Sequence, residues 1–442
     1  MSLRSAFDEA SRGFAWDLLP SVAMTFASLG LSEPLLRALA EQAFDVPTAV
    51  QRAAIPAVLR GRDVWGSART GSGKTLAFLL PLLERLSSTR PSGAGGVRAL
   101  VLVPTRELAD QIAQAAERFQ RYLSTRVKTR VLVGGVSINP QMLALRGGAD
   151  LVLATPGRLL DLLGQNALVL SALEVLVLDE ADRLFSSGFS EELSSVLQAL
   201  PARCQKLLFS ATFPASVCAF AEALLRDPER ICVDVELASD QTLIEQRVIE
   251  VDAPLRGKLL CHLLRTHDWP SVLVFVASRR DADRVATALA QSGLSATSLH
   301  GDLSQGARTQ ALTDFKAERV RVLVATDVAA RGLDVARLAA VVNYDLPRSP
   351  VDYLHRIGRS GRAGEPGVAL SFVSADTAAH FRLIEKRHRL ALVREQVVGY
   401  APRTQAEPVL PAQGGVKGKR KSKKDKLREA LARAGVDGNE RR

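Results

Sequence analysis

The sequence predicts an α/β protein that contains two doubly wound parallel sheets. Its 442 residues suffice for two domains of ordinary size and a tail. Apolar runs alternate with helix-like stretches, and this alternation requires crossover helices and therefore parallel strands. The alternation stops near residue 235 and restarts near residue 271, so we expect two domains joined by a short linker.

Strands are predicted where short apolar runs occur. These runs cover residues 99–103, 131–133, 151–154, 175–178, 206–209, 271–276, 320–325, 339–344 and 367–373. After the first run, five apolar residues at three-to-four spacing predict a helix with one buried face: Leu108, Ile112, Ala115, Phe119 and Leu123.

The domain boundaries follow from the same pattern. Residues 236–246 are polar and aperiodic, so we predict that they form the linker. The first domain then covers residues 24–235, the second domain residues 247–403, and a basic tail residues 404–442. Residues 1–23 are an N-terminal extension without a recognisable motif. Our hypothesis is that translation starts at Met24, which follows this extension.

Composition narrows the class of protein. A hydrophobic content of 47% and a charged content of 24% are typical of soluble globular domains. No apolar run is long enough to predict a transmembrane helix. The four cysteines lack the paired CxxC spacing of a zinc site, and they do not indicate a disulfide framework. We therefore expect incidental thiols in a reducing compartment, the cytoplasm, with no membrane partner.

The formal charge of +11 is concentrated near the C-terminus. Residues 417–442 contain eleven Lys or Arg against four Asp or Glu. Such a run is either a solvated surface or a contact for a polyanion, and we favour the polyanion.

A phosphate-binding loop is indicated after the apolar pair Val64-Trp65. The segment reads Ser67-Ala68-Arg69-Thr70-Gly71-Ser72-Gly73-Lys74-Thr75. Its glycines let backbone N–H groups converge on phosphate oxygens, and the following helix N-terminus adds positive potential. We expect Lys74 to reach the β- and γ-phosphates and the Thr75 hydroxyl to ligate Mg²⁺.

Two adjacent carboxylates follow a fully apolar strand, in the segment Asp179-Glu180-Ala181-Asp182. At the end of a buried strand, Asp179 is expected to hold Mg²⁺ and Glu180 to orient or deprotonate the attacking water. Together with the phosphate-binding loop, these acids predict hydrolysis of a nucleoside triphosphate.

The second half contains arginines at a spacing of three, in the segment His355-Arg356-Ile357-Gly358-Arg359-Ser360-Gly361-Arg362. Arg359 and Arg362 are expected to bind the γ-phosphate as arginine fingers. Because they lie in the other domain, the triphosphate would draw the domains together, and hydrolysis would weaken that bridge.

With these motifs in order, residues 26–373 resemble a DEAD-box ATP-dependent RNA helicase. The resemblance implies two tandem RecA-like domains, ATP and Mg²⁺, and RNA that is bound through its backbone with little sequence specificity. It also implies that Phe26 and Gln51 recognise adenine, which a carboxamide can pair with bidentately.

The resemblance assigns further roles. Contacts to the RNA backbone are implied for Arg106, Gly135, Thr155, Gly157, Arg158, Arg279 and Thr326. Coupling of hydrolysis to strand separation is implied for Asp182, Ser210, Thr212 and His355. Asp334 is implied to touch the ATP ribose, and we predict that residues 417–442 are a disordered or weakly helical RNA anchor.

Three positions depart from the family pattern. Arg69 stands where the family usually has glutamine, which leaves the fine geometry of the phosphate-binding loop open. Ser360 replaces a usual threonine, and Ala43 replaces a common glycine. The spacing and the basic tail most resemble the bacterial RhlE-like group.

The leading interpretation is an RNA-stimulated ATPase that separates short duplexes by closing on a single strand. An ATP-gated RNA clamp or an assembly scaffold with little unwinding would use nearly identical residues. A DNA translocase is disfavoured by Gln51 and by the acidic segment that begins at Asp179. Ribosome precursors and the RNA-decay machinery are both open as partners, and the oligomeric state is not encoded in these motifs.

Overall fold

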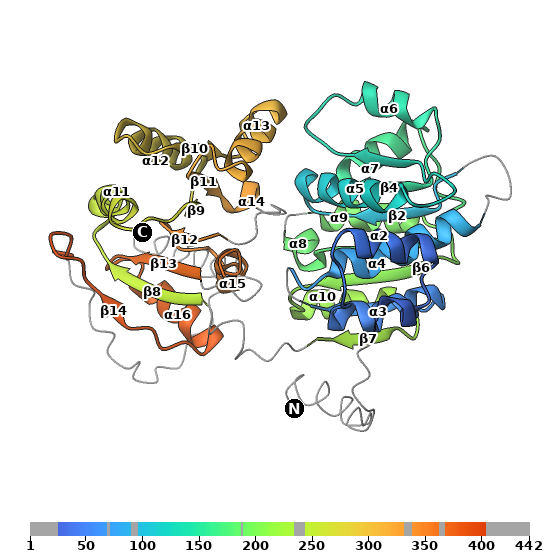
Figure 1. Ribbon diagram of the computed structural model, residues 1–442, viewed down its shortest axis with the longest axis horizontal. Coiled ribbons are helices and arrows are strands. Elements are labelled where there is room, and N and C mark those ends of the chain that lie inside the picture. Colours follow the sequence, from blue (N-terminus) through green and yellow to red (C-terminus); the bar gives the residue numbers. More distant parts are fainter. Residues whose placement is uncertain are drawn as a thin grey trace, which may run out of the picture.

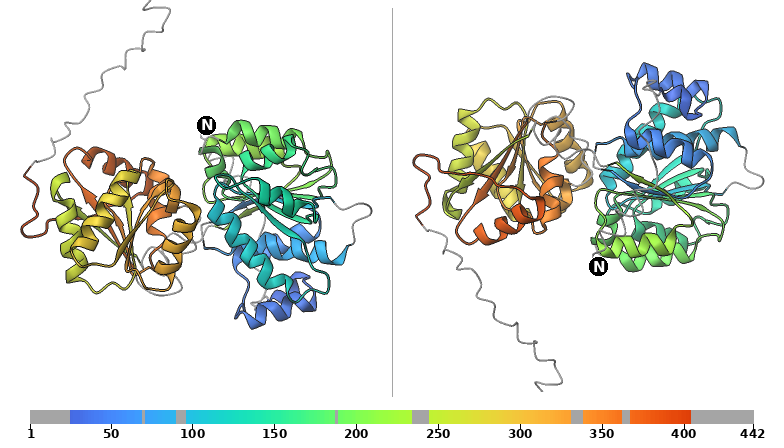
Figure 2. Two further views of the ribbon diagram at one scale, coloured as in Figure 1. Left: turned by 90° about the horizontal axis from the view of Figure 1, so that it is seen from above. Right: turned by 90° about the horizontal axis from the view of Figure 1, so that it is seen from below.

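The computed structural model describes residues 25–68, 71–89, 96–186, 189–233, 244–330, 338–361 and 367–403. Two α/β domains lie side by side, and each contains a seven-stranded sheet with helices on both faces (Figures 1 and 2). Every pairing between named strands in both sheets is parallel. The predicted fold class of two tandem RecA-like domains is therefore confirmed.

The first sheet has the strand order β3-β4-β2-β5-β6-β1-β7. Its strands are β1 (Val64–Ser67), β2 (Ala99–Leu102), β3 (Thr129–Leu132), β4 (Leu151–Ala154), β5 (Val175–Leu178), β6 (Gln205–Ser210) and β7 (Glu229–Cys232). Strands β5, β6 and β1 are neighbours in the sheet, so the three segments that follow them lie together at the carboxyl edge. Ligands of open α/β sheets bind at this edge.

Helices cover both faces of the first sheet (Figure 2). They are η1 (Phe26–Leu29), α2 (Glu33–Glu41), α3 (Ala49–Leu59), α4 (Lys74–Ser88), α5 (Arg106–Gln120), α6 (Asn139–Leu145), α7 (Pro156–Gly164), α8 (Ala181–Ser186), α9 (Ser190–Gln198) and α10 (Ala215–Leu224). Strand β2 illustrates that both faces of the sheet need a cover. Ala99 and Val101 pack into the core cluster on one face, and Leu100 and Leu102 pack into the cluster on the other. A strand buried on both faces reads as a continuous apolar run.

The second sheet has the order β10-β11-β9-β12-β13-β8-β14. Its strands are β8 (Ile244–Glu250), β9 (Val272–Val276), β10 (Ala296–Leu299), β11 (Val322–Thr326), β12 (Ala340–Asn343), β13 (Gly367–Val373) and β14 (Arg394–Glu395). The helical segments are η2 (Ala253–Leu255), α11 (Arg256–Thr266), α12 (Arg279–Gln291), α13 (Gln305–Lys316), α14 (Asp327–Ala330), α15 (Pro350–Ile357) and α16 (Ala378–His388). Segments η2, α11 and α12 pack on one face, and α13, α14, α15 and α16 pack on the opposite face.

The structure changes the predicted limits of the linker. Strand β8 begins at Ile244, so the last three residues of the predicted linker, 244–246, belong to the second sheet. The edge strand β14 pairs only with Val248 and Ile249, so β14 does not cover the start of β8. The start of β8 is therefore half-exposed and needs no apolar run. The rest of the linker, 236–243, lies outside the described residues, as do residues 1–24 and 404–442.

Other predicted elements shift by a few residues. The helix predicted from the apolar residues at three-to-four spacing after Leu108 is α5, and it ends at Gln120. Leu123, which was predicted to belong to this helix, lies after its end and packs against the same core. Strands β7 and β10 were not predicted, because their sequences lack a continuous apolar run. Within the described residues, no helix has the length and apolar character that crossing a bilayer demands, and the four cysteines are free thiols.

Candidate active site between the two domains

The predicted phosphate-binding loop lies between β1 and α4. Ser67 ends β1, and the backbone N–H of Ala68 donates to the carbonyl of Ser210 at the end of the neighbouring strand β6 (3.1 Å). Lys74 begins α4, is only 6% exposed, and donates from Nζ to the Ala68 carbonyl (2.7 Å). Its ammonium group therefore lies inside the turn of the loop, and Thr75 follows it on the first turn of the helix.

Gln51 connects the predicted adenine-binding segment to this loop. Its side-chain oxygen accepts from the Thr48 N–H (2.9 Å), and its Nε2 donates to the Gly73 carbonyl (3.2 Å). Gly73 has φ +94°, and a Cβ atom there would lie 2.5 Å from that Nε2. Glycine is therefore required both by the backbone conformation and by the close approach of Gln51. The carboxamide retains one N–H and one lone pair for a base.

The two adjacent acids lie at the end of β5, beside the loop. Asp179 is 3% exposed and accepts from the Glu180 N–H (2.9 Å). Burial raises the pKa of Asp179 to about 6, although nearby Lys74 opposes the shift. Glu180 has φ +53° and pairs with Arg183 (3.1 Å). A non-glycine residue in the left-handed region at such a place is typical of a functional site.

Asp182 is held by the segment after β6. Its backbone N–H donates to Ser210 Oγ (3.1 Å), and the hydroxyl of Thr212 donates to its carboxylate (2.5 Å). Ser210 Oγ in turn donates to the Thr212 carbonyl (2.8 Å). The three predicted coupling residues of the first domain thus form one hydrogen-bonded unit next to the acids.

The second domain supplies the opposite wall. A small pocket is lined by Arg183 of the first domain and by His355 and Arg359 of the second. His355 lies on α15, and Arg359 follows this helix and is 7% exposed. Burial, with Arg183 as the next cause, lowers the pKa of His355 to about 3. The imidazole is therefore neutral at physiological pH and lies within electrostatic reach of the first domain.

Arg356 holds this wall in place, and its role was not predicted. Its guanidinium is 2% exposed and forms two bonds to the carboxylate of Asp327 (2.6 and 2.7 Å). It also donates to Asn343 Oδ1 (3.0 Å) and to the carbonyl of Asp345 (2.6 Å). All four residues belong to the second domain, so this arginine of the motif is a structural clamp rather than a phosphate ligand.

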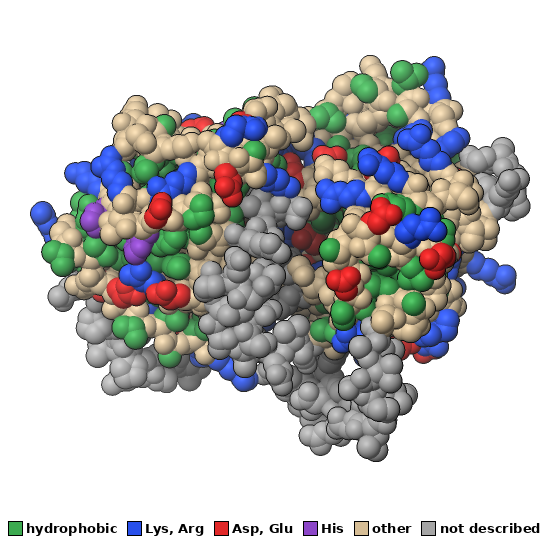
Figure 3. Space-filling model, viewed as in Figure 1, with side chains coloured by type: hydrophobic (Ala, Val, Ile, Leu, Met, Phe, Trp, Pro, Cys, Tyr) green, Lys and Arg blue, Asp and Glu red, His purple; other side chains and the backbone are tan. Residues whose placement is uncertain are grey.

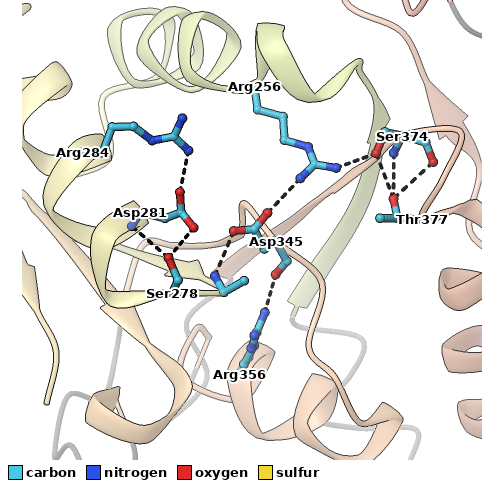
Figure 4. Close-up of polar contacts among 9 residues, drawn as sticks. Arg256, Ser278, Asp281, Arg284, Asp345, Arg356, Ser374 and Thr377 are labelled. Atoms are coloured by element: carbon cyan, nitrogen blue, oxygen red, sulfur yellow. Dashed lines mark hydrogen bonds and ion pairs between the residues drawn. The ribbon is translucent and has the colours of Figure 1, made fainter.

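Figure 4 shows how the same clamp connects the strand ends of the second sheet. Asp345 follows β12, accepts from Arg256 (2.8 Å), and accepts from the Ala277 N–H after β9 (2.9 Å). Arg256 also donates to Ser374 after β13 (2.5 Å). Three neighbouring strand ends are therefore fixed relative to one another.

The predicted RNA-binding residues of the first domain gather around one loop. Gly135 has φ +73°, and a Cβ atom there would lie 2.8 Å from the guanidinium of Arg106. Thr155 directly precedes α7, and its hydroxyl accepts from the Gly134 N–H (3.3 Å) rather than capping the helix. Arg158 donates to the Val136 carbonyl (2.8 Å).

Arg158 has unused hydrogen-bonding capacity. It is 8% exposed, and its Nη1 makes no hydrogen bond within the described part of the chain, whereas its Nε lies 3.5 Å from the Asp161 carboxylate in an ion pair. Gly157 is the preceding residue of α7, and a Cβ atom added to it would have no other atom within 4 Å. The backbone is therefore open at this position. Buried guanidinium donors beside an open backbone suit an anionic oxygen.

The RNA-binding residues predicted in the second domain are less closely grouped. Arg279 begins α12, is exposed, and pairs with Asp302. Thr326 ends β11 and is buried.

Two contacts between the domains involve the start of α5. Arg106 donates to Gln305 Oε1 of the second domain (3.1 Å). Glu107 forms an ion pair with Arg308 (2.5 Å), and the two side chains are 8% and 6% exposed. The structure thus engages Arg308 of the second domain with a carboxylate of the first domain.

Phe26 does not present its ring for stacking in this structure. It is 4% exposed and packs in the core cluster beneath α2 and α3. Four other predicted site residues, Arg69, Thr70, Asp334 and Arg362, lie outside the described residues.

Comparisons with known proteins agree on one family. Residues 48–220 match the family model described as DEAD/DEAH box helicase, and residues 256–364 match the helicase conserved C-terminal domain. Over 370 residues the chain is 41% identical to DEAD-box ATP-dependent RNA helicase 28 of Oryza sativa subsp. japonica. This alignment covers 83% of this chain and 46% of the rice protein. Over 364 residues it is 39% identical to the Bacillus cereus DEAD-box ATP-dependent RNA helicase CshA, covering 82% of this chain and 68% of that one.

Among solved structures, S. cerevisiae Dbp5 bound to RNA and ADP BeF3 matches with a TM-score of 0.76 and 31% identity. The match covers 84% of this chain and 95% of that one. The chain spans about half the length of the rice protein and about two thirds of the Bacillus protein.

Proposed function

Because the chain belongs to the DEAD-box helicase family, we propose that it is an RNA-stimulated ATPase that locally separates short RNA duplexes. The observation that carries the proposal is the pocket where Arg183, beside the catalytic acids, meets His355 and Arg359 of the other domain. A site assembled from two domains makes hydrolysis depend on their closure. RNA that bridges both domains then promotes hydrolysis by stabilising the closed form.

The first domain binds the nucleotide. Lys74 and the backbone N–H groups of residues 71–73 bind the β- and γ-phosphates, and Gln51 reads the adenine edge. The oxygen atoms of Thr75 and Asp179 fit Mg²⁺, since the buried Asp179 carboxylate accepts a hydrogen bond from the Glu180 N–H on one oxygen only, among the described residues, and burial raises its pKa. When bound, this ion would neutralise charge that develops on the phosphates.

Hydrolysis uses residues of both domains. Glu180 orients and deprotonates the attacking water, and its ion pair with Arg183 fixes the carboxylate. Arg359 and Arg362 stabilise the negative charge that develops on the γ-phosphate. Asp182, with its partners Ser210 and Thr212, transmits the state of the site to the RNA-binding edge.

RNA is proposed to lie along the edge formed by Arg106, Gly135, Thr155 and Arg158, and to continue over Arg279 and Thr326. The Nη1 donor of Arg158 supports this path, because it is buried and makes no hydrogen bond among the described residues. Contacts of this kind position the backbone without reading the bases. Closure on one bent strand would exclude its complement.

Glu180→Gln tests the proposal. Turnover in the presence of single-stranded RNA should fall on the order of 100-fold or more, because general base catalysis contributes about 10²–10⁴. Nucleotide affinity, measured with a fluorescent ATP analogue, should change little, because this side chain does not hold the phosphates. Glu191→Gln, an exposed acid in the first turn of α9, is the matched control and should behave as wild type.

Two outcomes would contradict the proposal. One is RNA-dependent ATP turnover that survives Glu180→Gln. The other is displacement of a labelled RNA strand without ATP.

A second function, an ATP-gated RNA clamp, is favoured by one observation. The buried pair of Glu107 and Arg308 bridges the domains and would stabilise a long-lived closed state. Slow release of RNA in the presence of a nonhydrolysable ATP analogue, together with little strand displacement in ATP, would identify a clamp.

We further propose a bacterial protein of the RhlE-like group that acts in the cytoplasm on ribosome precursors or with the RNA-decay machinery. The similarity to Bacillus CshA supports a bacterial member, and the four free thiols are compatible with a reducing compartment. Crosslinking to RNA in cells, followed by sequencing of the bound fragments, would decide between these targets.

A further inference from the structure

A groove on the second domain lies apart from the ATP and RNA sites described above. It has a volume of about 580 Å³ and runs between η2 with α11 on one side and α12 on the other. Helix α11 lies on the side of this domain that is turned away from the first domain (Figure 1). The volume is within the range of about 300–1,000 Å³ that is usual for ligand-binding clefts.

The floor of the groove is apolar. Val285 and Leu289 of α12 are 5% and 2% exposed and belong to the core of the second domain. Cys261 of α11 adds a partly exposed thiol. At one wall the rings of His262 and Tyr400 lie 5.4 Å apart. Such a surface accepts large apolar side chains rather than water.

The rim of the groove is cationic. Lys258 and Arg265 of α11 and Arg284 of α12 line it, and none of the described residues that line it is acidic. Arg265 donates to the Ser292 carbonyl (2.6 Å), and Arg284 is held by Asp281 (2.6 Å; Figure 4). Around α11 and α12, Figure 3 shows hydrophobic and histidine side chains with Lys and Arg beside them, and a few Asp or Glu side chains nearby. The rim cations are thus positioned around an apolar floor.

We propose that this groove is a docking site for an acidic segment of a partner protein. The segment would insert one or two large apolar side chains between α11 and α12 and place its carboxylates against Lys258, Arg265 and Arg284. Apolar anchors in a groove supply affinity, and complementary charge at the rim supplies specificity and speed of association. This proposal is independent of the ATPase function.

Two other occupants are less suited to the groove. The chain's own tail follows the described residues, but residues 417–442 carry eleven cations against four anions and would be repelled by this rim. Single-stranded RNA binds best where aromatic faces are open for stacking. Here the floor is formed by aliphatic side chains and Tyr344 is 7% exposed, so the accessible rings are confined to one wall, where those of His262 and Tyr400 lie against each other.

The test uses the full chain and a displayed library of short random peptides. Peptides that bind should be enriched in Asp, Glu and large apolar residues, and a synthetic copy should protect Cys261 from alkylation by iodoacetamide. Cys232, an exposed thiol of the first domain, should react at an unchanged rate and serves as the internal reference.

Substitutions on α12 locate the site. Ala288 lines the groove, and Ala288→Trp should weaken binding of the selected peptide at least about tenfold by filling the floor. Ala290→Trp is the matched control, since Ala290 is exposed on the same helix but does not line the groove. Lys258→Glu combined with Arg265→Glu should weaken binding by a similar factor. RNA-stimulated ATP turnover should be unchanged in all of these variants.

Three results would overturn the proposal: enriched peptides without an acidic bias, equal binding to the Ala288→Trp and wild-type proteins, or protection of Cys261 by oligouridine in place of the peptide. The last result would assign the groove to RNA. Loss of ATP turnover in the Glu180→Gln protein bears only on the ATPase proposal, so the two proposals fail separately.

Discussion

Glu107 and Arg308 form an ion pair across the two domains, with 2.5 Å between Oε1 and Nη2 and with both side chains more than nine-tenths buried. Burial lowers the pKa of Arg308, and Glu107 opposes that shift. Each group belongs to a different domain, so opening of the domains would return both charges to water. The pair therefore contributes to the closed arrangement rather than to the folding of either domain.

Arg308→Met should destabilise the closed form, because it leaves the Glu107 carboxylate buried without its partner. Loss of one partner of a buried pair costs about 3–5 kcal/mol, so RNA-stimulated turnover should fall on the order of 100-fold. Fluorescence energy transfer between dyes on the two domains should show fewer closed molecules. Adding Glu107→Gln should restore part of the loss, as expected for coupled residues.

Arg319→Met is the control for this pair. Arg319 also pairs with a carboxylate, that of Asp314, but its side chain is 58% exposed, and exposed pairs contribute about 0–1 kcal/mol. If both arginine variants have the same effect on closure, the Glu107 pair has no special role.

Closure should weaken at acidic pH because of His355. Its pKa is about 3 in this structure, where burial and the charges of Arg183, Lys74 and Arg359 disfavour the cation and Asp182 favours it. With the domains apart, we expect an ordinary pKa of about 6.5. The open form then binds more protons between these values, so closure is fully favoured above about pH 6.5 and is lost as the pH falls toward 3. The limiting slope is about tenfold per pH unit.

The same energy-transfer measurement, made with single-stranded RNA and a nonhydrolysable ATP analogue, checks this prediction. His355→Gln should flatten the dependence below about pH 6.5. An identical pH profile in the variant would show that other groups, such as Asp179, cause the effect.

Ala43 should be improved by glycine. It follows α2 with φ +58°, in the left-handed region, and donates from its N–H to the Ala40 carbonyl (3.0 Å). An L-residue there costs about 1–2 kcal/mol, which is partly offset by the larger chain entropy that glycine loses on folding. Ala43→Gly should raise the free energy of unfolding of the first domain by about 0.5 kcal/mol.

Ala40→Gly is the matched substitution with the opposite sign. Ala40 is exposed within α2, where glycine costs about 1 kcal/mol. Urea denaturation followed by the fluorescence of Trp65, in a background without the other two tryptophans, reports the first domain. Equal destabilisation by both glycines would show that position 43 has no strain to relieve.

The basic tail should contribute to the salt dependence of RNA binding. If about five of its cations meet single-stranded phosphates, deletion after Gln413 should flatten the log–log salt slope by about 3.5. Titration of labelled single-stranded RNA over a range of salt concentrations measures the slope. An unchanged slope would remove the tail from RNA binding, while ATP turnover at saturating RNA serves as the control for an intact core.

Local sequence was sufficient to predict a site where the functional side chains directly follow a strand in the same segment. The phosphate-binding loop after Val64 and the acids after Leu178 were located from their own residues, because a buried strand end determines which side chains reach the edge of a sheet. Strand β8 was missed because a half-exposed strand carries no apolar run. In the sequence, the preference for glycine at position 43 was visible only because Ala43 departs from the family pattern. The structure explains the preference, since Ala43 has a positive φ.

The sequence by itself determined the fold class with its two tandem domains, and it predicted which residues bind and hydrolyse ATP, since each of these depends on periodicity or on neighbours in the chain. Only the tertiary structure decided that Arg308 meets Glu107, that Arg356 clamps Asp327, and that Gln51 reaches Gly73. Those partners are far apart in the chain, and which charge meets which depends on how helices and domains pack. A motif therefore indicates what a residue is able to do, and packing selects the partner with which it does so.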